Sequence, residues 1–165
     1  MTTSIDTPIN APMNTLAQPL SDGTCHWLET NGFDPQQLDL PARYSDTALI
    51  LASRRGELAI VKELLAARVN INHRNMDGTN ALWAAIVADS EAIASLLLEH
   101  GVDIDNQNDN GATALMYASS AGKTAWVSYL LQKGANTSLA SLDDYTALDL
   151  AGNIECLRLL RQARR

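Results

Sequence analysis

Apolar residues recur along most of the chain in pairs of short stripes, each at the spacing of one face of a helix. The first stripe of a pair follows a residue whose side-chain oxygen can cap a helix, and it places Leu at the second and Ala at the fifth position after that cap. The caps are Thr47, Asn80, Thr113 and Thr146. The second stripe is Ile60, Val61, Leu64 and Leu65 in one pair and Trp126, Val127, Leu130 and Leu131 in another. The pattern predicts pairs of short helices whose apolar faces pack together.

The pairs repeat with a period of 33 residues. Thr-Ala-Leu occurs at 47–49, 113–115 and 146–148, and Asn-Ala-Leu occurs at 80–82. Gly56 and Gly122 are placed to end the first helix of a pair in a left-handed conformation. Asp77-Gly78 and Asn110-Gly111 are strong signals for a tight turn between one unit and the next. A fixed period of this length is typical of repeat proteins, in which each unit packs on its neighbours.

These motifs resemble the ankyrin repeat, a unit of two antiparallel helices and a hairpin-like finger. The resemblance implies an all-α repeat solenoid of the small, stand-alone, bacterial type. We expect full repeats at 42–74, 75–107 and 108–140, and a shortened C-terminal repeat at 141–165, because Leu159 and Leu160 follow Ala151 too closely for a full one. A degenerate N-terminal cap is expected at 24–41, within a repeat domain that spans 24–165. Residues 1–23 are expected to form a flexible tail, since they contain three prolines and no Lys or Arg.

The sequence departs from the ankyrin pattern at two kinds of position. The family's Thr-Pro-Leu-His motif ends in a histidine, and the residues at that position here are Ile50, Trp83, Met116 and Asp149. The bonding between units that this histidine mediates is therefore expected to be absent. Arg68 and Asp89 stand where other units have glycine. A left-handed backbone there costs on the order of 1 kcal/mol, and less for Asp. We expect these changes to loosen single turns and to leave the fold intact.

Composition and charge narrow the class of protein. The 165 residues are 46% hydrophobic and 19% charged, which is typical of a globular domain. The net charge of −7 argues against nucleic-acid binding, because a protein neutralises phosphates with a basic face. No apolar stretch is long enough to cross a membrane, and no signal peptide is recognised. Cys25 and Cys156 do not make a disulfide scaffold, so we expect a reduced, cytoplasmic protein.

Signals for catalysis or metal binding are weak in this sequence. Cys25-His26 suggests a nucleophile and its base in a weak hydrolase, but neighbouring residues of a helix point away from each other. The acidic stretch at 103–111 resembles a calcium loop, yet it has Asn108 where such a loop needs Gly, and Ala114 stands where it needs Glu. We therefore expect no catalysis, no metal and no cofactor.

The resemblance implies that the fingers and the first helices line a concave face that binds another protein. On the repeat register, the expected contacts are Tyr44, Arg54, Met76, Asp77, Trp83, Asp109, Asn110, Met116, Asp143 and Tyr145. Aromatic residues, Met and Arg are enriched where binding energy concentrates in interfaces. The alternative for Trp83 and Met116 is that they fill the groove between repeats, and the sequence does not decide between the two.

The distribution of charge indicates what kind of partner to expect. No Lys or Arg lies between Arg74 and Lys123, whereas seven acidic residues do. They are Asp77, Asp89, Glu91, Glu99, Asp103, Asp105 and Asp109. Such a field attracts a partner with a basic surface, although an acidic surface also serves solubility alone.

The sequence thus predicts a protein-binding module that is a monomer when unbound and binds neither nucleic acid nor membranes. Its expected role is that of a non-catalytic adaptor or stabilising partner. The alternative is a dedicated inhibitor of a basic enzyme, of the immunity-protein type found beside bacterial toxins. A tight complex with little salt dependence that abolishes a basic enzyme's activity would favour the inhibitor.

Overall fold

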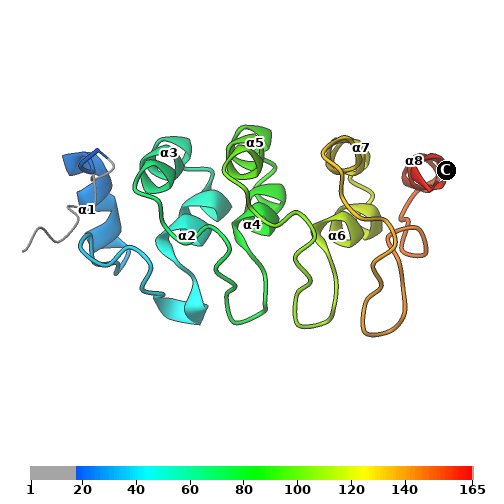
Figure 1. Cartoon of the computed structure of the whole chain (residues 1–165), viewed down its shortest axis with the longest axis horizontal. Coiled ribbons are helices and arrows are strands. Elements are labelled where there is room, and N and C mark those ends of the chain that lie inside the picture. The colour runs from blue at the N-terminus through cyan, green and yellow to red at the C-terminus, as the bar shows by residue number, and fades with distance from the viewer. Residues whose placement is uncertain (1–17, 165) are drawn as a thin grey trace, which may run out of the picture.

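The computed structural model describes residues 18–164, so positions 1–17 of the expected flexible tail lie outside the described residues. The described chain holds helices and turns without a strand, and it confirms the predicted all-α repeat solenoid (Figure 1). The helices are α1 (Asp22–Thr30), α2 (Ala48–Arg55), α3 (Leu58–Ala66), α4 (Ala81–Val87), α5 (Glu91–Glu99), α6 (Ala114–Ser120), α7 (Thr124–Gln132) and α8 (Ile154–Ala163). A short 3-10 turn, η1 (Arg43–Ser45), precedes α2.

The helices form two rows along the long axis of the molecule (Figure 1). The first helices, α2, α4 and α6, form one row, and α3, α5, α7 and α8 form the other. The fingers extend away from both rows, beyond the first helices. Each finger is closed by a backbone hydrogen bond between its first and fifth residues, at 42–46, 75–79, 108–112 and 141–145.

The first helices begin where the sequence predicts. The side-chain oxygens of Thr47, Asn80 and Thr113 accept the backbone N–H of the residue three positions later, at 3.4, 3.2 and 3.2 Å. Each bond satisfies one of the amide groups that a helix start leaves without a partner. Asn80 also donates its Nδ2 to the carbonyl of Asp103 at 2.9 Å, which ties the start of α4 to the loop after α5.

Aliphatic side chains at equivalent repeat positions form one continuous core. The fully buried leucines of the outer row are Leu64, Leu97, Leu130 and Leu160. The alanines five positions after each cap, Ala52, Ala85 and Ala118, are fully buried in the first helices. Their small side chains let neighbouring helices approach closely, while each buried leucine contributes roughly 1.5–3 kcal/mol of transfer free energy. The stability of the solenoid therefore comes from packing within each unit and between adjacent units.

Arg68 and Asp89 adopt the left-handed backbone expected at their glycine positions, with φ of 59° and 57°. The Asp89 carboxylate also accepts a hydrogen bond from the indole of Trp126. The same carboxylate lies 3.8 Å from Nζ of Lys123. At Asp89 the departure from the family pattern therefore adds a contact between the second and third repeats.

A ladder of polar contacts joins the loops that leave the outer helices. Oxygens of Asp39, Asn72 and Asp105 each accept a backbone N–H of the following repeat, at 2.7, 2.8 and 2.8 Å. The donors are Asn70, Asp103 and Asn136. Hydrogen bonding between units thus runs through positions other than the histidine that the sequence lacks.

The last repeat differs from the expected helix pair. Residues 147–150, behind Thr146, make only a turn, so the prediction of a helix there is wrong. The hydroxyl and backbone N–H of Thr146 donate to Asp149 at 2.6 and 2.8 Å, which holds the pKa of that carboxyl below its usual value. Gly152 then passes against the end of α6, where its N–H donates to the carbonyl of Ser119 at 2.8 Å. A Cβ on Gly152 would lie 2.6 Å from the carbonyl oxygen of Ser120. This close return explains how α8 reaches the outer row after so few residues.

The N-terminal cap is the single helix α1, which begins at Asp22, two residues before the boundary expected at 24. Ser21 is its N-cap, and its Oγ accepts the N–H of Thr24 at 3.2 Å. The backbone N–H and the hydroxyl of Ser21 both donate to Glu63 on α3, each at 2.7 Å. These two bonds link the start of α1 to the first full repeat.

The docking of α1 is expected to depend on pH through Glu63. The backbone N–H of Ser21, followed by the hydroxyls of Ser21 and Thr24, holds the pKa of Glu63 below its ordinary value of 4.5, although partial burial opposes this. A carboxyl whose pKa is lowered by folding contributes its full stability above its unfolded pKa and loses it as the pH falls through the folded pKa. We expect the protection of α1 amides from hydrogen exchange to fall as the pH drops below about 4.5.

Glu63→Gln should reduce the protection of α1 already at neutral pH, because the charged acceptor is gone. The matched control is Glu57→Gln, which removes one charge at the start of the same helix, α3. Glu57 makes no side-chain capping bond, so the control should leave α1 protection unchanged. Equal protection of α1 in wild type and Glu63→Gln would contradict the role of this bond.

Candidate functional site

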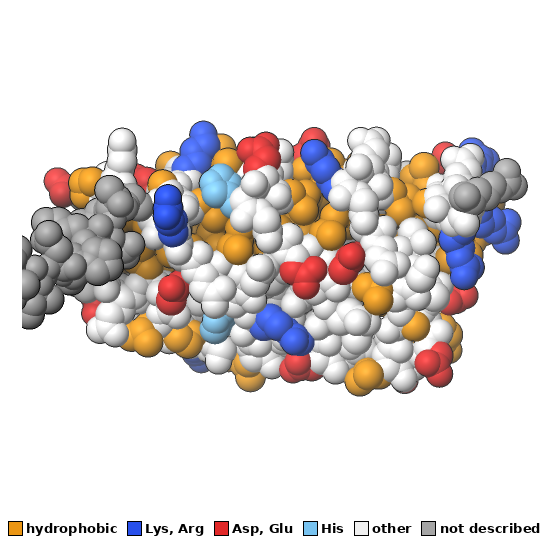
Figure 2. All heavy atoms as spheres, in the orientation of Figure 1, with side chains coloured by type: hydrophobic (Ala, Val, Ile, Leu, Met, Phe, Trp, Pro, Cys, Tyr) orange, Lys and Arg blue, Asp and Glu red, His pale blue; other side chains and the backbone are white. Residues whose placement is uncertain are grey.

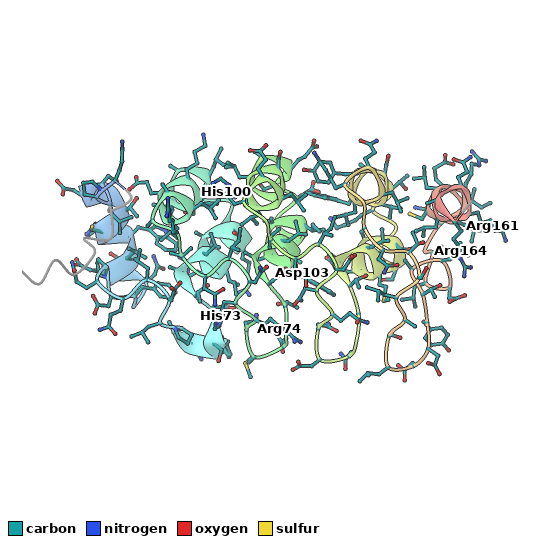
Figure 3. All side chains as sticks on the ribbon, viewed as in Figure 1. His73, Arg74, His100, Asp103, Arg161 and Arg164 are labelled. Carbon is teal, nitrogen blue, oxygen red and sulfur yellow. The ribbon has the colours of Figure 1, made fainter. Side chains whose placement is uncertain are left out.

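The four fingers are held in a row by backbone hydrogen bonds from each finger to the next, all of 3.0 Å. The N–H donors are Met76, Asp109 and Leu142, and the carbonyl acceptors are Tyr44, Asp77 and Asn110. Side chains at the finger bases add to this. Arg74 donates to the carbonyl of Gln107 at 2.9 Å, and Gln107 donates to the carbonyl of Ala140 at 3.0 Å. Figure 3 places Arg74 among the fingers. The fingers therefore form a preformed ridge.

Three predicted contacts on this ridge are large, exposed apolar side chains. Tyr44 is 56% exposed, Met76 is 57% exposed and Tyr145 is 52% exposed. Leu142, which the predicted set omits, is 75% exposed beside Asp143. Asp77, Asn110 and Asp143 are also exposed. Figure 2 shows separate hydrophobic patches along the edge where the fingers end.

The end of each first helix continues this surface, since Arg54, Val87 and Ser120 are exposed. In the first repeat, Asp46 at the end of the finger accepts a hydrogen bond from Arg54 at the end of α2. Residues four apart share a helix face, so Ile50 and Arg54, four and eight residues after Asp46, lie on the same side of α2. The equivalent positions on α4 are Trp83 and Val87. Val87 is 47% exposed. The half-buried Trp83 packs against Tyr117 of α6, with ring centroids 5.4 Å apart. Tyr117, a half-buried aromatic of the same surface, is absent from the predicted set.

Met116 does not belong to the exposed surface. Its side chain is 1% exposed, as is that of Ile50 at the equivalent position of the first repeat. The prediction that Met116 contacts a partner is therefore wrong, and its role is the alternative one of filling the space between repeats. Trp83 at the same position remains partly exposed, since an indole is too large for a site that a flexible Met fills completely.

Two charged residues of the predicted set have partners within the chain. Arg54 donates to Asp46, whose other bond is from Nδ2 of Asn75 at 3.0 Å. Asp109 lies 3.6 Å from Nη2 of Arg74. Within residues 18–164, no ion pair is formed by Asp77 or Asp143. The carboxylates best placed to pair with a basic side chain of a partner are therefore Asp77 of the second finger and Asp143 of the fourth.

Several of the acidic side chains between Arg74 and Lys123 accept hydrogen bonds from other groups of the chain. Asp89 accepts a hydrogen bond from the indole N–H of Trp126, and Asp105 accepts one from the backbone N–H of Asn136. Asp103 accepts the N–H of Asp105 at 3.0 Å. Carboxylates engaged in this way remain charged but are less available to a partner than those of the fingers.

The described residues do not gather around a reactive or metal-binding centre. Cys25 is half-buried and His26 is exposed on α1. Cys156 is buried on α8. Among residues 18–164, no three His, Cys, Asp or Glu side chains lie close enough together to hold a metal ion. None of the helices in this part of the chain has the length and apolar character needed to cross a membrane.

Comparison with known families agrees with this architecture. The family model described as "Ankyrin repeats (3 copies)" matches residues 16–108 and again residues 100–164. No curated protein matches the sequence. Since the family matches span most of the chain, the protein belongs to the ankyrin-repeat family, whose repeats generally serve as protein–protein interaction modules.

Proposed function

We propose that this protein binds a partner protein in the cytoplasm through its fingers and first helices, and that it acts as a non-catalytic adaptor or stabilising partner. The observation that carries the proposal is a row of exposed apolar side chains on fingers that are bonded to one another. The row consists of Tyr44, Met76, Leu142 and Tyr145. Binding energy concentrates in side chains of the aromatic and Met types, and a preformed surface lowers the entropy cost of association.

The partner that fits this surface has basic residues next to apolar ones. Asp77 follows Met76 on the second finger, and Asp143 follows Leu142 on the fourth. A net charge of −7 steers a basic partner toward the protein at low ionic strength. The half-buried rings of Trp83 on α4 and Tyr117 on α6, tilted by 32° to each other, add an apolar area on the first helices.

A dedicated inhibitor of a basic enzyme is the second candidate function. The observation that favours it is the bonding of each finger to the next, because the partners in tight enzyme–inhibitor complexes change little on binding. An inhibitor abolishes the activity of the bound enzyme, whereas an adaptor leaves that activity in place.

The experiment that tests the binding surface uses the intact protein as bait in a lysate of its source organism, with mass spectrometry of what is retained. The retained protein is then purified and titrated calorimetrically. We expect the double variant Met76→Ala/Asp77→Lys to weaken binding by about 30-fold or more, the effect of losing about 2 kcal/mol at a binding hot spot.

The matched control is Leu40→Ala. The exposed fraction of Leu40, 53%, is similar to that of Met76, 57%. Leu40 precedes the first finger and therefore lies outside the proposed surface. It should bind with the wild-type dissociation constant. Equal affinities for wild type and Met76→Ala/Asp77→Lys would place the interface elsewhere on the solenoid.

A further inference from the structure

Within residues 18–164, the last finger and α8 present a face that no further finger or helix covers. A Cβ on Gly78 would lie 2.9 Å from the backbone nitrogen of Asp109 on the next finger. A Cβ on Gly111 would likewise lie 2.9 Å from the backbone nitrogen of Leu142. The equivalent residue of the last finger is Asp144, which has the same left-handed backbone with φ of 63°. Its side chain therefore points to the side where a further finger would stand, out of the end of the solenoid.

Helix α8 supplies the other half of this end face. Cys156 and Leu160 are buried against the preceding repeat. Ile154, Arg158 and Arg161 lie at helical spacing on the opposite side of the helix, and Ile154 is 73% exposed. Together with Leu157 and Gln162 they line a shallow hollow of about 440 Å³. In Figure 3 the labels of Arg161 and Arg164 lie at this end of the molecule.

The two halves of the end face have opposite charge. α8 contains Arg158 and Arg161 and is followed by Arg164, against the single acid Glu155, which pairs with Arg158 at 3.2 Å. The last finger carries Asp143 and Asp144. Within residues 18–164, neither Arg161 nor these two aspartates form an ion pair. Figure 2 shows basic side chains along the upper part of this end and acidic ones below them.

In place of the monomer expected from the sequence, we propose that this end face binds the same face of a second copy of the chain, related by a two-fold axis that lies in the interface. Such an axis places α8 of one copy on the last finger of the other, and the reverse contact follows by symmetry. Arg158 and Arg161 then meet Asp143 and Asp144 twice. The exposed apolar side chains Leu142 and Ile154 lose their contact with water.

A second copy fits this face better than a partner of one charge sign. A purely acidic partner would suit the arginines of α8 but would face like charge at the last finger, which disfavours association. The face is small, so the dimer is expected to be weak, reversible and sensitive to salt. It also covers Leu142, Asp143 and Tyr145 of the proposed partner-binding surface. The dimer does not depend on that function, since Met76 and Asp77 lie on a finger distant from the end.

The test measures molar mass by sedimentation equilibrium, from about 1 µM to about 200 µM and at low and high salt. Arg158→Glu/Arg161→Glu makes the whole face acidic, and Asp143→Lys/Asp144→Lys makes it basic. We expect the wild type to approach the dimer mass at high concentration and low salt. Each charge variant alone should remain a monomer, while an equimolar mixture of the two should form a heterodimer.

The matched control is Glu57→Lys/Lys62→Glu, two exposed charge reversals at the N-cap of α3 and within it, which should dimerise as the wild type does. Circular dichroism verifies that each variant is folded, and Asp144→Asn offers a milder change that should weaken the dimer without reversing its charge. A wild type that is monomeric throughout would overturn the proposal, as would a mixture that stays monomeric. Growth beyond the dimer would also overturn it, because a two-fold contact closes on itself.

Discussion

Gly111→Ala is expected to lower the free energy of unfolding by about 2–4 kcal/mol, the sum of a left-handed backbone cost and a steric cost against fixed backbone. Gly111 has φ of 74°, in the region that favours glycine. A Cβ there would lie 2.9 Å from the nitrogen of Leu142 and 3.1 Å from Cα of Ser141. These atoms belong to the last finger, whose hydrogen bond to Asn110 would have to lengthen.

Gly134→Ala is the matched control for this prediction. Gly134 has φ of 87°, but a Cβ there would meet nothing within 4 Å. Its expected cost is therefore only the backbone term of about 1 kcal/mol. Urea unfolding followed by circular dichroism measures both values. Equal losses of stability in the two variants would contradict the close packing of the last finger against Gly111.

The repeats were predictable because local signals and the long period agree. A cap followed by Leu and Ala at fixed positions recurs every 33 residues, and Thr47, Asn80 and Thr113 cap helices as expected. The same motif at Thr146 predicts a helix that does not form. Leu159 follows Ala151 by eight positions, whereas Leu64 follows Ala52 by twelve. The shorter segment cannot complete the first helix and a turn, so only the outer helix forms in the last repeat.

The exposed surface was harder to predict because the register gives a residue's position but not its neighbours. Met116 and Trp83 share one register position, yet only Met116 is fully buried. Tyr117, one residue further along α6, meets Trp83 from the adjacent repeat. A contact between different positions of different repeats leaves no periodic signal. The pairing of Arg54 with Asp46 is likewise confined to one repeat, but it follows from helix geometry, since residues eight apart across a helix start share a face.

Arg54→Ala is expected to destabilise the protein through Asp46 by about 1–3 kcal/mol. Removing one partner of a fully buried ion pair costs about 3–5 kcal/mol, but solvent screening lowers this figure where a partner is partly exposed. The Asp46 side chain is 6% exposed, whereas that of Arg54 is 40% exposed. Without the guanidinium, the hydrogen bond from Asn75 at 3.0 Å is the one that the Asp46 side chain keeps within residues 18–164.

Arg55→Ala removes the neighbouring guanidinium, which donates to the neutral amide of Asn31 at 2.6 Å on the exposed surface. Its expected cost is below about 1 kcal/mol. The double variant Asp46→Ala/Arg54→Ala should lose less stability than the sum of the single variants, because no unpaired carboxylate is left behind. Additive losses would show that Arg54 acts independently of Asp46. Coupled losses would show that Arg54→Ala also disturbs the first finger through Asp46, so a loss of partner affinity in this variant would not by itself assign Arg54 as a direct contact.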